Sequence, residues 1–233
     1  MRLRSARGAT DTRDVLELLA IALLAAGTVV AGRWWLHRVD AIGRKVALPW
    51  SAWMLPLLGF IVAIPVVRHH NEETRLSHAA SVLSGTKATV HCQSGTGEWV
   101  DVGNELGYVK YGPDGVPEHS TLIKHAQCGL LASYLGGGRD HPSLDEITAV
   151  HVLTHESMHI SGITNEAQAE CAAVQRDYQT AMLLGANERQ AQFLTRAYWH
   201  GVYPYMPDDY RTADCRAGGR LDEGQPNAPW AFS

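Results

Sequence analysis

Two histidines and a glutamate in the C-terminal half of the chain stand in the order H-E-x-x-H, as His155, Glu156 and His159. On a helix, side chains at positions i and i+4 lie on one face, one turn apart. That separation lets two imidazoles share one tetrahedral Zn²⁺. Glu156 stands at the neighbouring edge of the same face, where a carboxylate can take a proton from a water that the metal activates. The pattern therefore predicts a zinc site with a catalytic base.

A catalytic zinc site uses three protein ligands, and the chain after the second histidine supplies acidic candidates for the third. Gly162 is expected to end the motif helix, and Thr164 or Asn165 to cap a new one. Glu166 falls in the first turn of that helix, from which its carboxylate can swing back to the histidine pair. Glu170 follows one turn later and can accept the second N–H of a ligating imidazole. Glu166 is the preferred third ligand, with Glu170 as the alternative.

This arrangement resembles the gluzincins, the thermolysin-like branch of the zinc metallopeptidases. In that family an H-E-x-x-H helix precedes a helix with N-E-x-x-x-D, whose Glu is the third ligand and whose Asp supports a ligand from behind. Residues 165–170, N-E-A-Q-A-E, are similar to that element, with Glu in place of Asp. The membrane-anchored prenyl-protein endopeptidases have a similar E-x-x-x-D helix. Over residues 155–170 the resemblance implies a metallopeptidase with His155, His159 and Glu166 as ligands and Glu170 behind them.

The metzincins provide a rival pattern, H-E-x-x-H-x-x-G-x-x-H. Gly162 falls on their glycine, but Asn165 stands where their third histidine would be, and an amide is a poor zinc ligand. The gluzincin reading is therefore preferred.

A gluzincin-like site also implies a His or Tyr that donates to the oxyanion of the transition state. His200, Tyr203 and Tyr205 follow the last predicted helix and are the candidates, with His200 and Tyr203 preferred. His151 lies one turn before the first motif histidine on the same face. It contacts substrate or a ligand's carboxylate, or it is a hydrogen-bonded, partly buried residue without a role in catalysis.

Three helices are expected to position these residues. The first covers about 144–161 and begins with a capping box formed by Ser143 and Glu146. The second runs from about 165 to 184, and the third from about 188 to 200. Upstream, short strand-like runs are expected at 88–91, 99–102 and 107–111. Residues 121–135 begin as a strand and end as a short helix.

Two apolar runs precede this domain, at residues 15–31 and 46–67. A bilayer core about 30 Å thick needs about 20 helical residues, so the second run is long enough and the first is marginal. Four tryptophans near the run ends suit the headgroup level, namely Trp34, Trp35, Trp50 and Trp53. The first run can also be read as a signal peptide that is cleaved after Ala31.

The predicted organisation is a two-span membrane anchor at 1–67, a juxtamembrane linker at 68–90 and a zincin-like metallopeptidase domain at 91–233. The fold class is therefore α+β, with two N-terminal transmembrane helices followed by a mainly helical domain that contains a small β-sheet.

Charge and cysteine usage indicate the surroundings of the protein. Residues 1–75 hold ten Lys and Arg against six Asp and Glu, whereas residues 76–233 hold ten against eighteen. A basic head on an acidic body argues against a nucleic-acid partner and favours a lipid bilayer. All four cysteines, at 92, 128, 171 and 215, follow the second apolar run, which predicts two disulfides and an extracytoplasmic domain. The alternative is four buried thiols in the cytosol, and the positive-inside rule does not decide the orientation.

The function expected from these observations is that of a zinc-dependent peptidase anchored by two spans in the cell membrane, acting on a protein or peptide substrate. The alternative is a non-enzymatic, disulfide-stapled envelope module that binds a metal at a vestigial peptidase site. Glu156 favours the enzyme, because a structural metal site has no use for an acid beside its first histidine.

Overall fold

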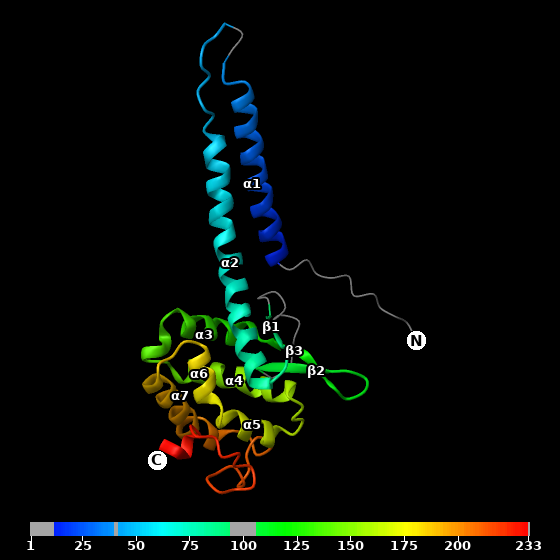
Figure 1. Ribbon diagram of the computed structural model, residues 1–233, viewed down its shortest axis with the longest axis vertical. Coiled ribbons are helices and arrows are strands. Elements are labelled where there is room, and N and C mark those ends of the chain that lie inside the picture. The colour runs from blue at the N-terminus through cyan, green and yellow to red at the C-terminus, as the bar shows by residue number, and fades with distance from the viewer. Residues whose placement is uncertain (1–11, 40–41, 94–105, 233) are drawn as a thin grey trace. The chain divides into compact units, whose positions relative to one another are not determined.

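The computed structural model describes residues 12–39, 42–93 and 106–232. The chain divides into two compact units, Met1–Asn71 and Glu72–Ser233. The described residues are mostly helical, with one small three-stranded sheet in the second unit (Figure 1). The prediction of a helical chain with a small sheet is therefore confirmed.

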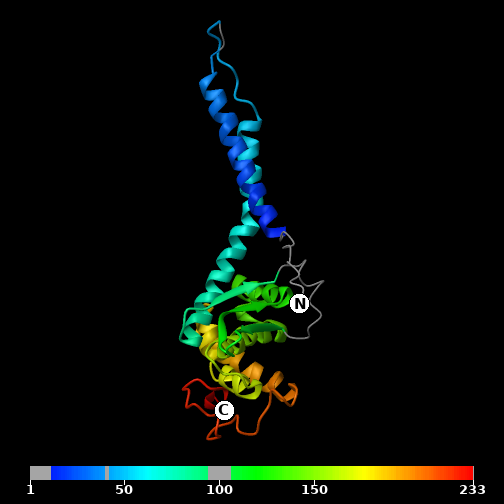
Figure 2. The ribbon, with the colours of Figure 1, turned by 90° about the vertical axis from the view of Figure 1, so that its right-hand side faces the viewer.

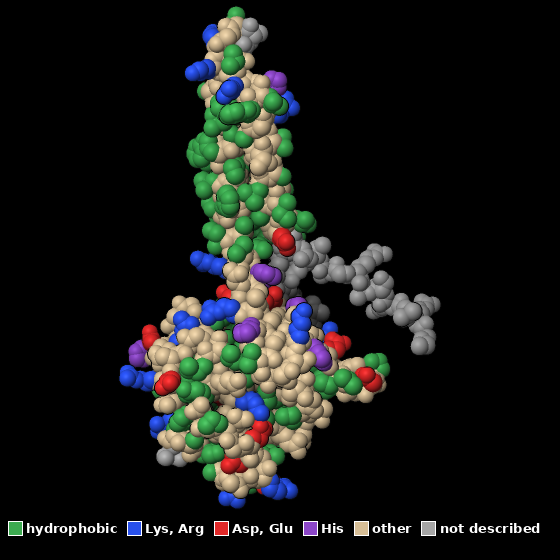
Figure 3. Space-filling view, viewed as in Figure 1, with side chains coloured by type: hydrophobic (Ala, Val, Ile, Leu, Met, Phe, Trp, Pro, Cys, Tyr) green, Lys and Arg blue, Asp and Glu red, His purple; other side chains and the backbone are tan. Residues whose placement is uncertain are grey.

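The first unit is built on helix α1 (Thr12–Leu36) and the first part of helix α2 (Ser51–Ser84). Both helices are long and apolar enough to cross a membrane, as predicted. Large apolar side chains are exposed along them, such as Leu18, Ile21 and Phe60 (Figure 3). Water does not favour such a surface, whereas lipid does.

The two helices lie beside each other in Figure 1 and overlap in the turned view of Figure 2. A Cβ on Gly59 would stand 2.9 Å from Cγ of Leu24, and one on Gly27 would stand 2.5 Å from Cδ of Pro56. Glycine at these two positions therefore permits the close approach, as small residues do between helices in membranes.

Helix α2 does not stop where the second apolar run ends. It continues to Ser84, so residues 68–84 of the predicted juxtamembrane linker at 68–90 are helical. The physical reason is a second, shorter apolar stripe at helical spacing. Leu76, Ala79, Ala80 and Leu83 are all buried in the second unit. Burying this stripe keeps the polar segment helical, because tertiary packing provides most of a helix's stability.

The sheet of the second unit contains β1 (Thr89–Cys92), β2 (Gly107–Tyr111) and β3 (Pro117–Ile123). The order is β1-β3-β2, with β1 parallel and β2 antiparallel to β3, so among the described residues β2 is an edge strand. The strands predicted at 88–91 and 107–111 are present, and the strand at the start of 121–135 begins earlier, at Pro117. The run at 99–102 lies outside the described residues. Helix α3 (His125–Gly136) follows as predicted.

Helix α4 (Leu144–Ile160) is the centre of the second unit and contacts α3, α5, α6, α7, β2 and β3. Its predicted capping box is present: the Ser143 side chain accepts from the Glu146 N–H, and the Glu146 carboxylate accepts from the Ser143 N–H. The chain turns after α4 at Gly162, whose φ of 102° is strained for any residue with a side chain.

The second predicted helix is two helices, α5 (Glu166–Val174) and α6 (Asp177–Leu183). The interruption falls at Gln175, whose buried side chain donates to the carbonyls of Cys171 and Leu221 and accepts from the N–H of Glu223. Two of these bonds tie Gln175 to the C-terminal segment at the point where the helix is interrupted, and local sequence gives no sign of them. Helix α7 (Glu188–Gly201) has the predicted capping box of Asn187 and Gln190.

Three short 3₁₀ turns complete the described chain, at Gly138–Asp140, Tyr203–Tyr205 and Pro229–Phe232. Two disulfides, as predicted, join Cys92 to Cys128 and Cys171 to Cys215. The first ties β1 to α3, and the second ties α5 to the irregular C-terminal segment. The sequence itself left the pairing open.

Candidate metal centre

Helix α4 carries the H-E-x-x-H motif on its buried side. His155, Glu156 and His159 are 7%, 5% and 7% exposed. Polar side chains are rarely buried to this degree without hydrogen-bond or metal partners, because removal from water costs free energy that only such partners offset. The arrangement of their partners therefore indicates what the site is for.

Three ligand atoms converge above this face of α4. Nε2 of His155 lies 2.9 Å from Nε2 of His159, and Oε2 of Glu166 lies 3.1 Å and 3.3 Å from these two nitrogens. In a tetrahedral zinc site with bonds of about 2.0–2.1 Å, neighbouring ligand atoms stand about 3.3 Å apart. The three atoms therefore fit around one ion of that size, and the residues form one of the described groups that could hold a metal.

The groups behind the two imidazoles decide which nitrogen of each carries the proton. Nδ1 of His159 lies 2.7 Å from the carbonyl oxygen of Ile163, and Nδ1 of His155 lies 3.0 Å from Oε2 of Glu170. A carbonyl and a carboxylate can only accept, so both Nδ1 atoms donate. In the neutral rings both Nε2 atoms then present lone pairs to each other and to Glu166 (2.9–3.3 Å). A cation between them removes that repulsion, which is the strongest sign of a metal site.

Protons compete with a metal for the same atoms. Burial lowers the pKa of His155, but hydrogen bonds to Glu166 and Glu170 outweigh it and raise the pKa to about 9. Burial and the neighbouring charge of His155 lower the pKa of His159. The hydrogen bond from His155 lowers the pKa of Glu166. In the absence of a metal ion, a proton on His155 therefore takes the place of the ion between His155 and Glu166.

Glu170 lies behind the imidazole of His155, on the Nδ1 side of the ring. Its side chain is 1% exposed, and its Oε2 accepts from both His155 and His151, at 3.0 Å and 2.9 Å. The hydroxyl of Tyr198 donates to Oε1 at 2.6 Å. Burial raises the pKa of Glu170, yet the charge and hydrogen bonds of His151 and His155 hold it well below its ordinary value. Glu170 is therefore an anchored anion that orients the His155 ring.

A cavity of about 630 Å³ opens over the three ligand atoms. Its walls come from the edge strand β2, from α4 and from the segment after α7, the last through Met206, Pro207 and Tyr210. Glu156 faces β2, where a Cβ on Gly107 would stand 3.1 Å from Oε1 of Glu156. Gly107 thus leaves room for the carboxylate beside the strand.

The residues predicted to stabilise an oxyanion are not brought to this cavity. His200 and Tyr203 line a separate hollow of about 520 Å³ with Trp199 and Arg211, and Tyr205 is 82% exposed. Tyr111 and Tyr210 line the main cavity instead. The Tyr210 ring centroid lies 5.7 Å from that of His155.

Sequence reasoning missed Tyr210 because it lies in an irregular segment without periodicity. The disulfide from Cys215 to Cys171, the residue after Glu170, ties this segment to α5. Cys215 was the one sequence feature that could have indicated this. A disulfide from Cys215 to α5 brings the residues near Cys215, Tyr210 among them, towards the helix that carries Glu166.

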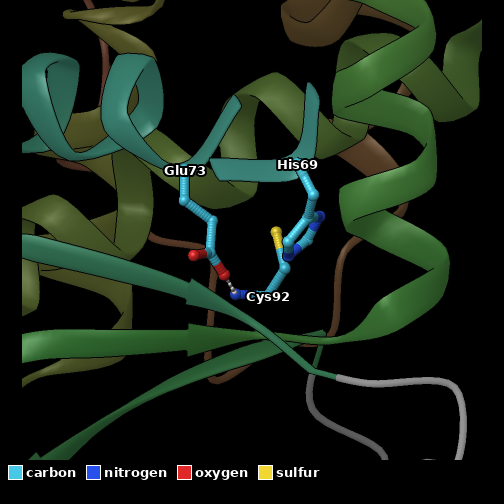
Figure 4. Close-up of side chains that lie close together, drawn as sticks. All are labelled: His69, Glu73 and Cys92. Atoms are coloured by element: carbon cyan, nitrogen blue, oxygen red, sulfur yellow. Dashed lines mark hydrogen bonds between the residues drawn. The ribbon is translucent and has the colours of Figure 1, made fainter. Parts of the chain in front are cut away.

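A second set of side chains lies close enough together to hold a metal, but its cysteine is not a free thiol. It consists of His69, Glu73 and Cys92, drawn in Figure 4. The sulfur of Cys92 is bonded to Cys128, so it is not available as a thiolate. The backbone N–H of Cys92 donates to Oε1 of Glu73 at 2.7 Å, which gives that carboxylate a structural role.

Comparison with protein-family models, with curated proteins and with solved structures finds no match to this chain. The chemistry of the site therefore rests on the geometry of its own residues.

Proposed function

We propose that this chain is a membrane-anchored zinc peptidase with a zincin-like catalytic domain of the gluzincin type. The observation that carries the proposal is the convergence of two Nε2 lone pairs and one carboxylate oxygen within 3.3 Å, with both Nδ1 protons held by acceptors behind the rings. Two imidazoles and one carboxylate, with a further position open to a cavity, are the donor set of catalytic zinc.

His155, His159 and Glu166 would hold the ion, which when bound supplies Lewis-acid activation of water and of a carbonyl group. Glu156 follows His155 directly and faces the cavity, so its carboxylate can accept a proton from the attacking water. The same carboxylate then passes the proton to the leaving amine. Its neighbour Gly107 keeps the path to the edge strand open.

Two further parts of the cavity suit a peptide. Strand β2 is an edge strand, and an extended peptide can add to such an edge through main-chain hydrogen bonds. Tyr210 can donate to the oxyanion. Burial and the nearby carboxylates, Glu166 first, raise the pKa of Tyr210 to about 12, so its hydroxyl keeps its proton at neutral pH.

The surroundings of the enzyme follow from the two helices that can cross a membrane and from the two disulfides. Disulfides persist in oxidising compartments, so we place the catalytic domain outside the cytoplasm. The two helices would anchor it in the cell membrane. Its substrate would be a protein or peptide and not a nucleic acid.

The test uses the full chain in detergent micelles. Metal content is measured by plasma mass spectrometry, and turnover with a library of fluorogenic peptides. We expect one zinc per chain, and we expect Glu156→Gln to keep it while turnover falls by up to about 10⁴-fold, since only the base is lost. Asp145→Asn, an exposed acid on the same helix, is the matched control and should leave both unchanged.

Two results would contradict the proposal. Undiminished turnover in Glu156→Gln would remove Glu156 from the mechanism. Bound zinc without any turnover in the wild-type chain would favour the alternative, a metal-binding envelope module without catalytic activity.

A further inference from the structure

His151 is a buried histidine whose two ring nitrogens both face carboxylates. It is 2% exposed and lies on α4, one turn before His155. Its Nδ1 lies 2.9 Å and 3.1 Å from the two oxygens of Asp177, and its Nε2 lies 2.9 Å from Oε2 of Glu170. An ionised carboxylate only accepts, so the contacts are complete when both nitrogens carry protons. His151 is then an imidazolium ion.

The surroundings hold this ring in one orientation from three sides. Asp177 is the first residue of α6 and is fully buried, and it stands there because α5 and α6 are separate helices. The ring of Tyr198, on α7, stacks on His151 with centroids 3.6 Å apart and planes 13° apart. The Tyr198 hydroxyl donates to the other oxygen of Glu170. Helices α4, α5, α6 and α7 therefore meet at His151 and Glu170.

A protonated His151 offsets one of the two negative charges in this part of the core. Glu170 and Asp177 are two buried carboxylates that face the same ring. An unpaired buried charge is costly, and a cation between two anions offsets much of that cost. Burial lowers the pKa of His151, but Asp177 and Glu170 outweigh it and raise the pKa to about 10.

We propose that His151 is a positioning residue of the metal centre: it lies between Asp177 and Glu170, contacts both carboxylates, and so anchors Glu170 behind the ligand His155. The inference rests on the proposed metal site. Glu170 uses one oxygen for both histidines, at 2.9 Å and 3.0 Å. The cation beside that oxygen reduces its basicity, so the Nδ1 proton stays on His155. It also holds the carboxylate where it fixes the ring plane of His155, with Nε2 aimed at the ion.

A second metal ion is the competing explanation, since His151, His155 and Glu170 also lie close enough together to hold one. A divalent metal on Nε2 of His151 would leave that ring neutral and would itself offset the two buried carboxylates, with Asp177 accepting from Nδ1 in either case. The protonation state of His151 and the number of zinc ions per chain therefore distinguish the two explanations.

Nitrogen-15 NMR of histidine-labelled full chain in micelles tests the protonation state directly. In the zinc-loaded protein we expect one histidine with both nitrogens protonated throughout pH 6–8, and we expect its signals to vanish in His151→Gln. A His151 with one protonated nitrogen, or two zinc ions per chain of which His151→Gln loses one, would overturn the inference.

Zinc affinity, measured by competition with a chelator, tests the positioning role, and the visible spectrum of the cobalt-substituted protein reports ligand geometry. Removal of groups that support ligands costs about 10–100-fold in metal affinity, so we expect a rise of that size in the zinc dissociation constant of His151→Gln, with an altered cobalt spectrum. Asp177→Asn should give a smaller change in the same direction, and it serves as the second variant if His151→Gln does not fold.

Thr180→Val is the matched control. Thr180 is fully buried on α6, one turn after Asp177, and accepts a hydrogen bond from Thr154 of α4. Loss of this hydrogen bond in Thr180→Val should lower the stability of the fold but leave zinc affinity and the cobalt spectrum unchanged. Folded His151→Gln and Asp177→Asn variants with wild-type affinity would overturn this inference alone, whereas a wild-type chain that binds no zinc would overturn the proposed function as well.

Discussion

The histidine–carboxylate cluster has two halves, which differ in whether their polar atoms already have hydrogen-bond partners within the protein. In the inner half, His151, Glu170, Asp177 and Tyr198 are buried and bind one another. In the outer half, Nε2 of His155, Nε2 of His159 and Oε2 of Glu166 face one another at the floor of a cavity, and each offers a lone pair. The inner half is complete without a ligand, whereas the three residues of the outer half could hold a metal ion.

This difference separates stability from metal binding. Groups of the inner half should contribute mainly to the free energy of unfolding, because breaking a buried ion pair leaves an uncompensated charge. Groups of the outer half should contribute mainly to affinity for the ion. The four predictions below test that separation.

The largest effect is expected at Glu166, whose side chain is 40% exposed. Glu166→Ala leaves two neutral imidazoles, which hold Zn²⁺ poorly, so zinc should be lost on dialysis and turnover with it. The affinity loss should exceed the about 10–100-fold that groups behind a ligand cause. Equilibrium dialysis with plasma mass spectrometry measures it.

Glu188→Ala is the control for that variant, because Glu188 also stands in the first turn of a capped helix. It should keep zinc. Retained zinc in Glu166→Ala would move the third ligand to another residue of the cavity, with Glu170 and His151 to be tested in turn.

Asp177→Ala should produce the largest loss of stability. It leaves the His151 charge buried with one partner removed, and such changes cost about 3–5 kcal/mol. Urea unfolding of the zinc-free chain, followed by tryptophan fluorescence, measures the effect. Glu166→Ala in the same assay should be close to wild type, since its side chain is partly exposed. Equal losses in both variants would refute the separation of the two halves.

Tyr210→Phe should lower kcat by about 10²-fold while zinc content stays constant, because one oxyanion donor is lost and no ligand is changed. The control is Tyr205→Phe, in the same segment but 82% exposed, which should leave kcat unchanged. If instead Tyr210→Phe raises KM alone, the hydroxyl binds substrate and does not stabilise the transition state.

A smaller loss of zinc than in Glu166→Ala is expected at Glu170. Glu170→Ala should weaken zinc binding by about 10–100-fold, because His155 remains but loses the acceptor that orients it. The same variant should also lose stability, since Glu170 belongs to the inner half. A variant that releases zinc completely while Glu166→Ala retains it would exchange the roles of the two glutamates.

Much of the fold follows from local patterns. The capping boxes at Ser143 and Asn187 start α4 and α7 where they were predicted, because side-chain and backbone groups within three residues decide a helix start. The predicted linker is helical over 68–84, and the helix predicted from 165 to 184 is two helices. Both differences coincide with contacts to residues distant in the sequence. Residues 68–84 pack through Leu76 into the core, and Gln175, between the two helices, binds the C-terminal segment at Leu221.

By itself, the sequence determined the H-E-x-x-H face of α4, the acids one and two turns into the next helix, the two apolar spans and the even set of cysteines. Each of these depends on spacing along one element, which helical geometry converts directly into position. Tertiary structure decided that Glu166 meets the two Nε2 atoms, that Asp177 and Tyr198 enclose His151 and Glu170, and that Tyr210 stands in place of His200 and Tyr203 at the cavity. These contacts join residues on separate helices and on an irregular segment, where the packing of the whole core sets the distances and no sequence period describes them.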